Sequence, residues 1–159
     1  MPPSVGGAVF NGWRFLAWPD FDARWSALIL EVARRRSIDP IAYTSTSASR
    51  MLRAVNEVIR DRIARDPNAA DFRLRGDLSA WRRVKFLGRF RLFYRFDSTT
   101  RTVILTWLND ENTLRKDGAR SDPYAVFVRM LTCGDIPSDW DALAVGAAAL
   151  DPYPPDDPP

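Results

Sequence analysis

Apolar residues in the first half of the chain recur at the spacing of an amphipathic helix. Four of them fall at i, i+4, i+7 and i+11 and so share one helical face: Phe21, Trp25, Leu28 and Val32. This spacing predicts a helix over residues 20–36. A second broad apolar face follows over residues 48–63, after capping residues at 45–47 and before Asp66-Pro67, which ends a helix. The loop between them contains Pro40, so we predict a hairpin of two helices.

The period changes to two after Phe72, which indicates β-strands. Apolar side chains alternate with mostly basic ones over residues 89–96, as in a strand with one buried and one polar face. Residues 102–108 are apolar on both faces, as expected of an interior strand. Residues 13–17 predict a further short strand, which stops before Pro19 because proline cannot donate to a β-ladder.

One more helix is predicted near the end of the chain. Asp122-Pro123 opens it, Gly134 lies just past its end, and Trp140 and Leu143 anchor a short final segment. The predicted order is strand, two helices, three strands and helix. We therefore expect an α+β fold with an antiparallel-rich four-stranded sheet. One face of this sheet packs against the N-terminal helical hairpin and the C-terminal helix.

The length of 159 residues is sufficient for one domain with a substantial core. Residues 1–9 are rich in proline and glycine and are expected to be flexible, residues 10–146 form the domain, and the Pro/Asp-rich residues 147–159 are expected to be a disordered tail. The longest apolar run, residues 142–150, is too short to cross a bilayer. The amino end has no basic stretch typical of a secretory signal. We therefore expect a cytoplasmic protein without a membrane anchor.

The composition excludes several catalytic designs. Histidine is absent and Cys133 is the single cysteine, which excludes Ser-His-Asp triads, Cys-His dyads and two-histidine ribonuclease chemistry. The same absence leaves no ligand set for zinc, and we expect neither a metal nor another cofactor. The formal net charge is only +3, but residues 72–129 carry 13 basic and 6 acidic side chains, whereas residues 130–159 carry six aspartates and no base. A basic middle followed by an acidic end is typical of proteins that bind polyanions.

The register of the hairpin near residue 87 decides how these cations are arranged. A two-residue loop at 87–88 mixes apolar and basic side chains on both faces. A three-residue loop at 86–88 pairs Lys85 with Arg89 and Arg83 with Arg91, and we favour this register. One sheet face then carries five cations interleaved with two aromatic residues: Arg83, Lys85, Arg89, Arg91, Arg95, Trp81 and Phe93.

Like charges that face each other across strands repel, so we expect this basic face to be neutralised by an external anion. Interleaved aromatic residues fit a single-stranded nucleic acid, whose bases stack on them. The alternative is that carboxylates of the two helices neutralise the face, but the helices carry few acidic residues.

Several segments resemble known toxins. Similarity to the strand pair of RelE-superfamily toxins is carried by RGDL at 75–78, WRRV at 81–84 and GRFRLFYR at 88–95. A narrower resemblance to the YhaV family is carried by NGW at 11–13, VILTWLNDENTLR at 103–115 and DPYAVF at 122–127. The resemblance extends from about residue 11 to residue 143.

This resemblance implies a RelE-like fold and the toxin of a type II toxin–antitoxin pair. Such a toxin is an endoribonuclease that cleaves mRNA on the ribosome and thereby inhibits translation. The resemblance also implies a cognate PrlF-like antitoxin with a swapped-hairpin DNA-binding domain, through which the complex contacts operator DNA.

RNA cleavage without histidine or metal implies attack by the ribose 2′-hydroxyl on the adjacent phosphorus. Arg91 and Arg115 are our candidates to stabilise the charge on the phosphorane. Lys85 is the candidate for a base or acid. Tyr124 is placed to donate to the leaving oxygen or to stack on a base, although it is equally suited to packing beneath its helix. Glu111 is a further candidate base, although residues 109–112 read equally well as a structural turn and helix cap.

The remaining candidates bind RNA without taking part in the chemistry. They are Arg83, Arg89, Arg95, Lys116 and Arg120. Two alternatives remain open at this point, a ribosome-independent endoribonuclease and an RNA- or ribosome-binding inhibitor that does not cut. A DNA-binding regulator is disfavoured because the basic residues lie on predicted strands rather than on a recognition helix.

Overall fold

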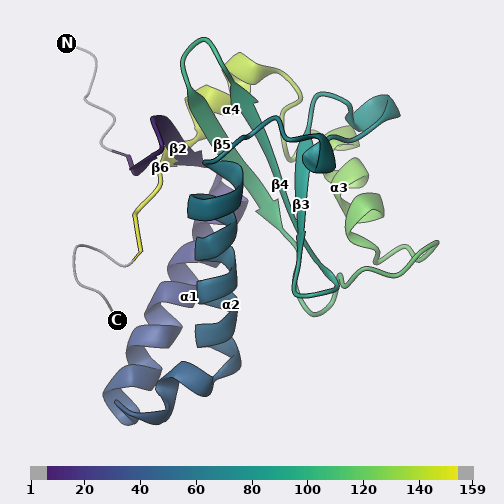
Figure 1. The fold of residues 1–159 in the computed structure, drawn as a ribbon. Coiled ribbons are helices and arrows are strands. Elements are labelled where there is room, and N and C mark those ends of the chain that lie inside the picture. Colours follow the sequence, from purple (N-terminus) through teal and green to yellow (C-terminus); the bar gives the residue numbers. More distant parts are fainter. Residues whose placement is uncertain (1–6, 154–159) are drawn as a thin grey trace.

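The computed structural model describes residues 7–153, and its centre is one twisted β-sheet (Figure 1). The strand order is β1-β2-β5-β4-β3, and β6 pairs with β2 beside β1. β2 and β5 are parallel, whereas the other pairs are antiparallel. The strand bounds are β1 Val9–Phe10, β2 Trp13–Ala17, β3 Arg82–Phe86, β4 Phe90–Asp97, β5 Thr102–Leu108 and β6 Ala148–Ala149.

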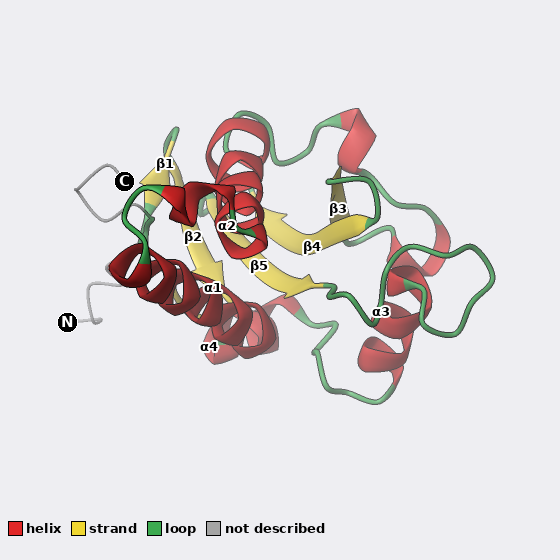
Figure 2. Ribbon diagram, turned by 90° about the horizontal axis from the view of Figure 1, so that it is seen from below, coloured by secondary structure: helices red, strands yellow, loops and turns green. Residues whose placement is uncertain are grey.

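Helices cover both faces of this sheet (Figures 1 and 2). Their bounds are α1 Pro19–Ile38, α2 Ser47–Glu57, α3 Pro123–Thr132 and α4 Trp140–Gly146. α2 continues directly into a π-helical segment, Val58–Ile63, within the stretch predicted as a single helix. No helix in the described part of the chain is long and apolar enough to span a membrane. The structure is α+β, as predicted, but its sheet has six strands and not four, because the short strands β1 and β6 pair along the outer edge of β2.

The expectation that all helices lie on one face is wrong. Adjacent residues of β4 point in opposite directions, so Leu92 packs into the core beneath α1 and α2, whereas Phe93 packs into a second core beneath α3 and α4. Val103 and Ile104 of β5 divide in the same way. A strand that is apolar on both faces must be covered on both, and α3 supplies Phe127 to the second face.

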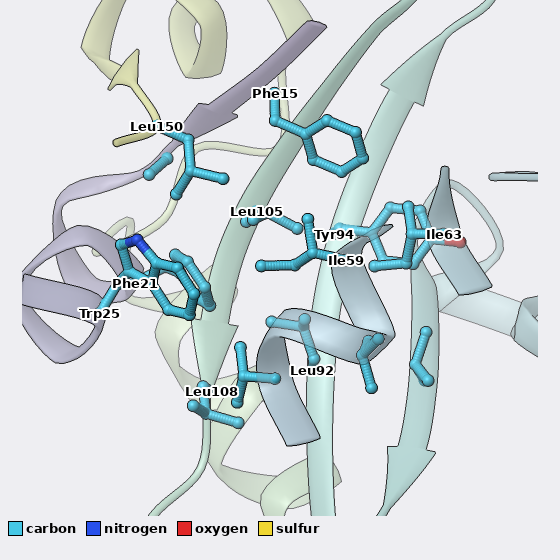
Figure 3. Packing of buried hydrophobic residues seen from close by; sticks show 14 of the residues in the cluster. Phe15, Phe21, Trp25, Ile59, Ile63, Leu92, Tyr94, Leu105, Leu108 and Leu150 are labelled. Atoms are coloured by element: carbon cyan, nitrogen blue, oxygen red, sulfur yellow. The ribbon is translucent and has the colours of Figure 1, made fainter. Parts of the chain in front are cut away.

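The larger core lies between the sheet and the pair α1 and α2 (Figure 3). Phe21 and Trp25 of α1 stack with their ring centroids 6.0 Å apart. Ile59 and Ile63 of the π-helical segment reach the same core. The phenol of Tyr94 crosses this core and donates a 2.6 Å hydrogen bond to the Pro67 carbonyl, which satisfies its buried hydroxyl.

The β3–β4 hairpin differs from the predicted register. Phe86 pairs with Phe90 and Lys85 with Arg91, so the three-residue loop comprises residues 87–89 and not 86–88. Leu87 and Gly88 have φ of 44° and 74° in this loop. The predicted pairs Lys85–Arg89 and Arg83–Arg91 are therefore wrong. The rings of Phe86 and Phe90 pack 5.9 Å apart, which favours the observed register.

The two registers differ by a shift of two residues, which leaves the assignment of side chains to faces unchanged. Arg83, Lys85 and Arg91 still share one face of the sheet, as predicted. Arg89 moves from the strand into the loop.

The segments expected to be disordered are partly ordered. Within the predicted tail 147–159, β6 pairs with β2, Leu150 is buried, and the indole of Trp25 donates to the Asp151 carbonyl at 2.9 Å. Within the predicted flexible residues 1–9, Ala8 is buried and Val9 begins β1. Composition predicted disorder at both ends of the domain, but residues from each end pair with β2 and cover its outer edge. Residues 1–6 and 154–159 lie outside the described part of the chain.

Removing the side chain of Leu150 tests whether this end of the chain supports the fold. Leu150 is 2% exposed in the larger core, and we expect Leu150→Ala to lower the free energy of unfolding by about 2–5 kcal/mol. The matched control is Val145→Ala, because Val145 is 88% exposed, and its effect should stay within about 0.5 kcal/mol. Urea unfolding followed by circular dichroism measures both. Equal stability of the two variants would contradict the packing of the C-terminal segment.

Candidate functional site

Tyr124, at the start of α3, is the point on which three arginines from three different segments converge. Arg91 of β4 donates from Nε to the Tyr124 hydroxyl at 3.3 Å. The guanidinium carbons of Arg115 and Arg83 lie 5.2 and 5.9 Å from the centre of the Tyr124 ring. The ring stands edge-on to Phe93, 5.6 Å away between centroids, which fixes its orientation. We call Arg83, Arg91, Arg115 and Tyr124 the arginine–tyrosine cluster.

Arg91 is a buried cation without a carboxylate partner. Only 6% of the residue is exposed, and its Nη1 donates to the carbonyls of Gly88 and Phe90 at 2.9 and 2.8 Å. The ion pairs found among residues 7–153 involve Arg34, Arg35 and Arg115 instead. A buried charge is stabilised by an opposite charge, and Arg91 has only dipoles around it. This guanidinium is therefore suited to an external anion.

Arg83 adds a second cation with unused hydrogen-bonding capacity. Its Nη1 donates to the Asp71 carbonyl at 3.0 Å, while its buried Nε has no hydrogen-bond partner among residues 7–153. Buried donors are normally paired, so this unpaired N–H is a desolvated donor that costs stability within the described fold.

Arg115 is held in place by the buried carboxylate of Asp122. Its Nη1 lies 2.6 Å from Asp122 Oδ1, and this hydrogen bond raises the pKa of the Arg115 guanidinium. Asp122 also accepts from the main-chain N–H groups of Lys116 and Tyr124, at 2.8 and 3.0 Å. One carboxylate thus caps α3 and anchors the arginine next to it. The sequence predicted the cap but not the ion pair, because nothing in the spacing of residues 115 and 122 signals it.

Two further predicted residues lie beside the cluster. Arg89 donates from Nε to the Arg115 carbonyl at 3.1 Å, which ties the hairpin loop to the segment before α3. Lys85 is exposed and lies opposite Arg91 in the strand register. The structure thus brings Lys85, Arg89, Arg91 and Arg115 to one end of the β3–β4 hairpin.

The other three predicted RNA-binding residues differ in how accessible their side chains are. Arg95 donates to the Ser138 carbonyl and lies 5.4 Å from the Trp81 ring, and burial lowers the pKa of its guanidinium. Lys116 and Arg120 are exposed on the loop that precedes α3. Arg95 is therefore engaged in packing, whereas the other two side chains remain accessible.

Glu111 lies on a different surface. It lines a groove of about 650 Å³ between α1, α2 and the hairpin tip, together with Leu28, Met51, Leu87 and Phe90. No member of the arginine–tyrosine cluster lines this groove. The structure therefore does not bring Glu111 together with Arg91.

The aromatic residues expected to stack on bases are not accessible. Trp81 and Phe93 are buried, and Phe127 stacks on Phe93 with ring centroids 4.2 Å apart. That expectation is wrong because α3 covers this part of the sheet face. Tyr124 is the partly exposed aromatic residue that remains among the arginines.

Comparison with known proteins identifies the same family by a family model and by individual relatives. Residues 15–148 match the YhaV toxin family, which is described as "Toxin with endonuclease activity, of toxin-antitoxin system". The chain is 40% identical over 139 residues to the "Ribonuclease toxin YhaV" of Escherichia coli (strain K12), covering 84% of this chain and 90% of the relative. "Toxin YhaV" of E. coli O157:H7 shows the same identity and coverage. No solved structure matches the chain.

Asp122 offers a test of how the cluster is held together. Asp122→Ala removes a helix cap and leaves Arg115 without its buried partner, so we expect the free energy of unfolding to fall by about 2 kcal/mol or more. The matched control is Asp117→Ala, because Asp117 is 3.6 Å from Arg115 but its side chain is 99% exposed. Chemical denaturation of the two variants gives the comparison. A loss in Asp117→Ala as large as that in Asp122→Ala would refute this account of the anchor.

Proposed function

This chain belongs to the YhaV family of toxins with endonuclease activity from toxin–antitoxin systems, and we propose that it cleaves mRNA on the ribosome and so inhibits translation. The observation that supports this proposal most directly is the pair Arg83 and Arg91, two partly or fully buried guanidiniums beside Tyr124 without carboxylate partners. Such a cluster has the charge and the donor geometry that a phosphodiester requires.

The proposed reaction is attack of the ribose 2′-hydroxyl on the adjacent phosphorus. The bond from phosphorus to the 5′-oxygen of the next nucleotide breaks, which leaves a 2′,3′-cyclic phosphate and a 5′-hydroxyl. The proton of the 2′-hydroxyl leaves with attack, and the departing 5′-oxygen takes up a proton. This route needs no activated water, and the chain contains no histidine to activate one.

Each member of the site has a role in this proposal. Arg91 and Arg115 hold the non-bridging oxygens and stabilise the charge that develops on the phosphorane. Arg83 and Arg89 hold the flanking phosphates. The Tyr124 hydroxyl, which already accepts from Arg91, donates to the leaving oxygen. Lys85 is the candidate for proton transfer with the 2′-hydroxyl, and it is favoured over Glu111 because Glu111 lines the groove instead.

The partners follow from the family. A toxin of a toxin–antitoxin system has a cognate antitoxin, and we propose a PrlF-like one with a swapped-hairpin DNA-binding domain that carries the complex to operator DNA. Lys116 and Arg120, which are exposed, extend the proposed RNA-binding surface beyond the cluster, whereas Arg95 is engaged in packing.

Cleavage of a defined mRNA with and without programmed ribosomes tests the proposed function. We expect cuts only on ribosomes, and we expect Arg91→Ala to slow them on the order of 10²-fold or more, because a charge-stabilising donor is lost. Lys85→Ala should also slow cleavage, whereas Arg65→Ala, a control at an exposed arginine outside the site, should not. Circular dichroism confirms that each variant is folded.

The other outcomes of this assay separate the alternatives. Cutting of naked RNA at the same rate would retain the nuclease and reject ribosome dependence. A block of translation with intact mRNA would instead identify an inhibitor that binds without cutting.

The chemistry of the ends tests the 2′-hydroxyl mechanism separately. Replacing the ribose on the 5′ side of the cut by 2′-deoxyribose removes the nucleophile, so we expect cleavage at that position to stop. The unmodified RNA should yield a 5′-hydroxyl end, which polynucleotide kinase labels directly without prior phosphatase treatment. Continued cleavage of the deoxy substrate, or a 5′-phosphate end, would show that water is the nucleophile.

A further inference from the structure

Asn109, the residue directly after β5, is a fully buried polar side chain that the proposed chemistry does not use. It belongs to the stretch 109–112, which the sequence alone presents as a turn. The amide of asparagine combines two donors with an acceptor, so a buried asparagine can bridge N–H and carbonyl groups at once.

The Asn109 amide joins the main chain of two segments. Its Oδ1 accepts from the N–H of Arg91 at 2.7 Å. Its Nδ2 donates to the carbonyl of Arg89 at 3.1 Å and to that of Thr113 at 2.8 Å. Both donors of the amide are therefore used, one toward the β3–β4 hairpin and one toward the segment that leads to Arg115.

The two segments joined in this way carry the cations of the site. Arg115 donates from its N–H to the Arg89 carbonyl at 3.1 Å, so the main chain before α3 follows the start of β4. The Asn109 amide adds a second link, because it bonds to the main chain of Arg91 in β4 and of Thr113 in the segment before α3. Its hydrogen bonds fix the backbone positions from which Arg91 and Arg115 extend toward Tyr124.

The local turn has separate hydrogen bonds that do not involve the Asn109 side chain. The Asp110 carboxylate accepts from the Thr113 hydroxyl and from the Asn112 N–H, each at 2.9 Å. The Asp110 N–H in turn donates to the Thr113 hydroxyl at 2.9 Å. The Asn109 amide closes this turn through the Thr113 carbonyl, and it is the side chain of the turn that also connects it to the β3–β4 hairpin.

We propose that Asn109 is a positioning residue that holds Arg91 and Arg115 in register on one phosphate. This inference rests on the proposed function, because it assigns Asn109 a part in the same reaction without contact with RNA. Misplacing a catalytic group by about 1 Å costs on the order of 10²-fold in rate. RNA binding, which several cations share, depends less on this register.

The test compares Asn109→Ala and Asn109→Asp with the control Asn112→Ala, whose side chain is exposed in the same turn. Single-turnover cleavage at saturating RNA should fall on the order of 10²-fold in both Asn109 variants and stay unchanged in the control. Affinity for a 2′-O-methyl RNA, measured by fluorescence anisotropy, should be retained in all three variants. A purely structural residue would lower the folded fraction and leave the rate per folded molecule unchanged.

Asn109→Asp keeps the acceptor for the Arg91 N–H at nearly the same size, and it replaces the donating Nδ2 by a carboxylate oxygen that repels the Arg89 and Thr113 carbonyls. It therefore carries the test if Asn109→Ala does not fold. Wild-type cleavage with an unchanged rate in folded Asn109→Asp would overturn the inference and leave the proposed function intact.

A second readout does not depend on activity. Proton exchange of the Arg91 Nε–H, which donates to Tyr124, is followed by NMR. We expect faster exchange in Asn109→Asp and no change in Asn112→Ala. Unchanged exchange in Asn109→Asp would overturn the positioning role even if no RNA is cleaved, whereas absence of cleavage by the wild-type chain would count against the proposed function alone.

Discussion

The stack of Phe127 on Phe93, with ring centroids 4.2 Å apart, is the contact on which the position of the site depends. It fixes α3 against the face of the sheet that carries Arg83 and Arg91. The ring of Trp81 packs edge-on against Phe127 in the same core, with ring centroids 5.0 Å apart. Because Tyr124 lies one turn before Phe127 on α3, this packing sets the tyrosine beside the arginines.

The arginines of the site lower the stability of the fold, because few carboxylates neutralise them. Among the described residues, the guanidiniums of Arg83 and Arg91 hydrogen-bond only to carbonyls and to the Tyr124 hydroxyl. Both lie on one sheet face, where like charges repel. Only Arg115 has a buried carboxylate, Asp122, within the cluster. A fold optimised for stability alone would place more carboxylates here. Retaining unpaired guanidiniums is typical of sites whose function conflicts with stability.

The arrangement also explains how one short segment serves several purposes. The loop between β5 and α3 carries Arg115 and ends in the cap of α3. Main-chain and Asn109 amide hydrogen bonds connect it to the β3–β4 hairpin. Loops that bear functional residues are normally mobile, and this one is restrained at both ends by the buried side chains Asn109 and Asp122. Site geometry and loop order therefore depend on the same bonds.

Most of the helices and strands, and the family, could be predicted from the amino-acid sequence. Periodicity located the strands 13–17 and 102–108 and the helix after Asp122, and the segments at 103–115 and 122–127 carried the resemblance that the comparison confirmed. The hairpin register, the covering of both sheet faces and the packing of Leu150 could be seen only in the folded molecule. A period of two assigns side chains to faces, but a shift of two residues leaves every face unchanged, so periodicity cannot select between such registers. Which element covers a face depends on contacts between residues far apart in the chain, and these contacts alone place Tyr124 among the arginines.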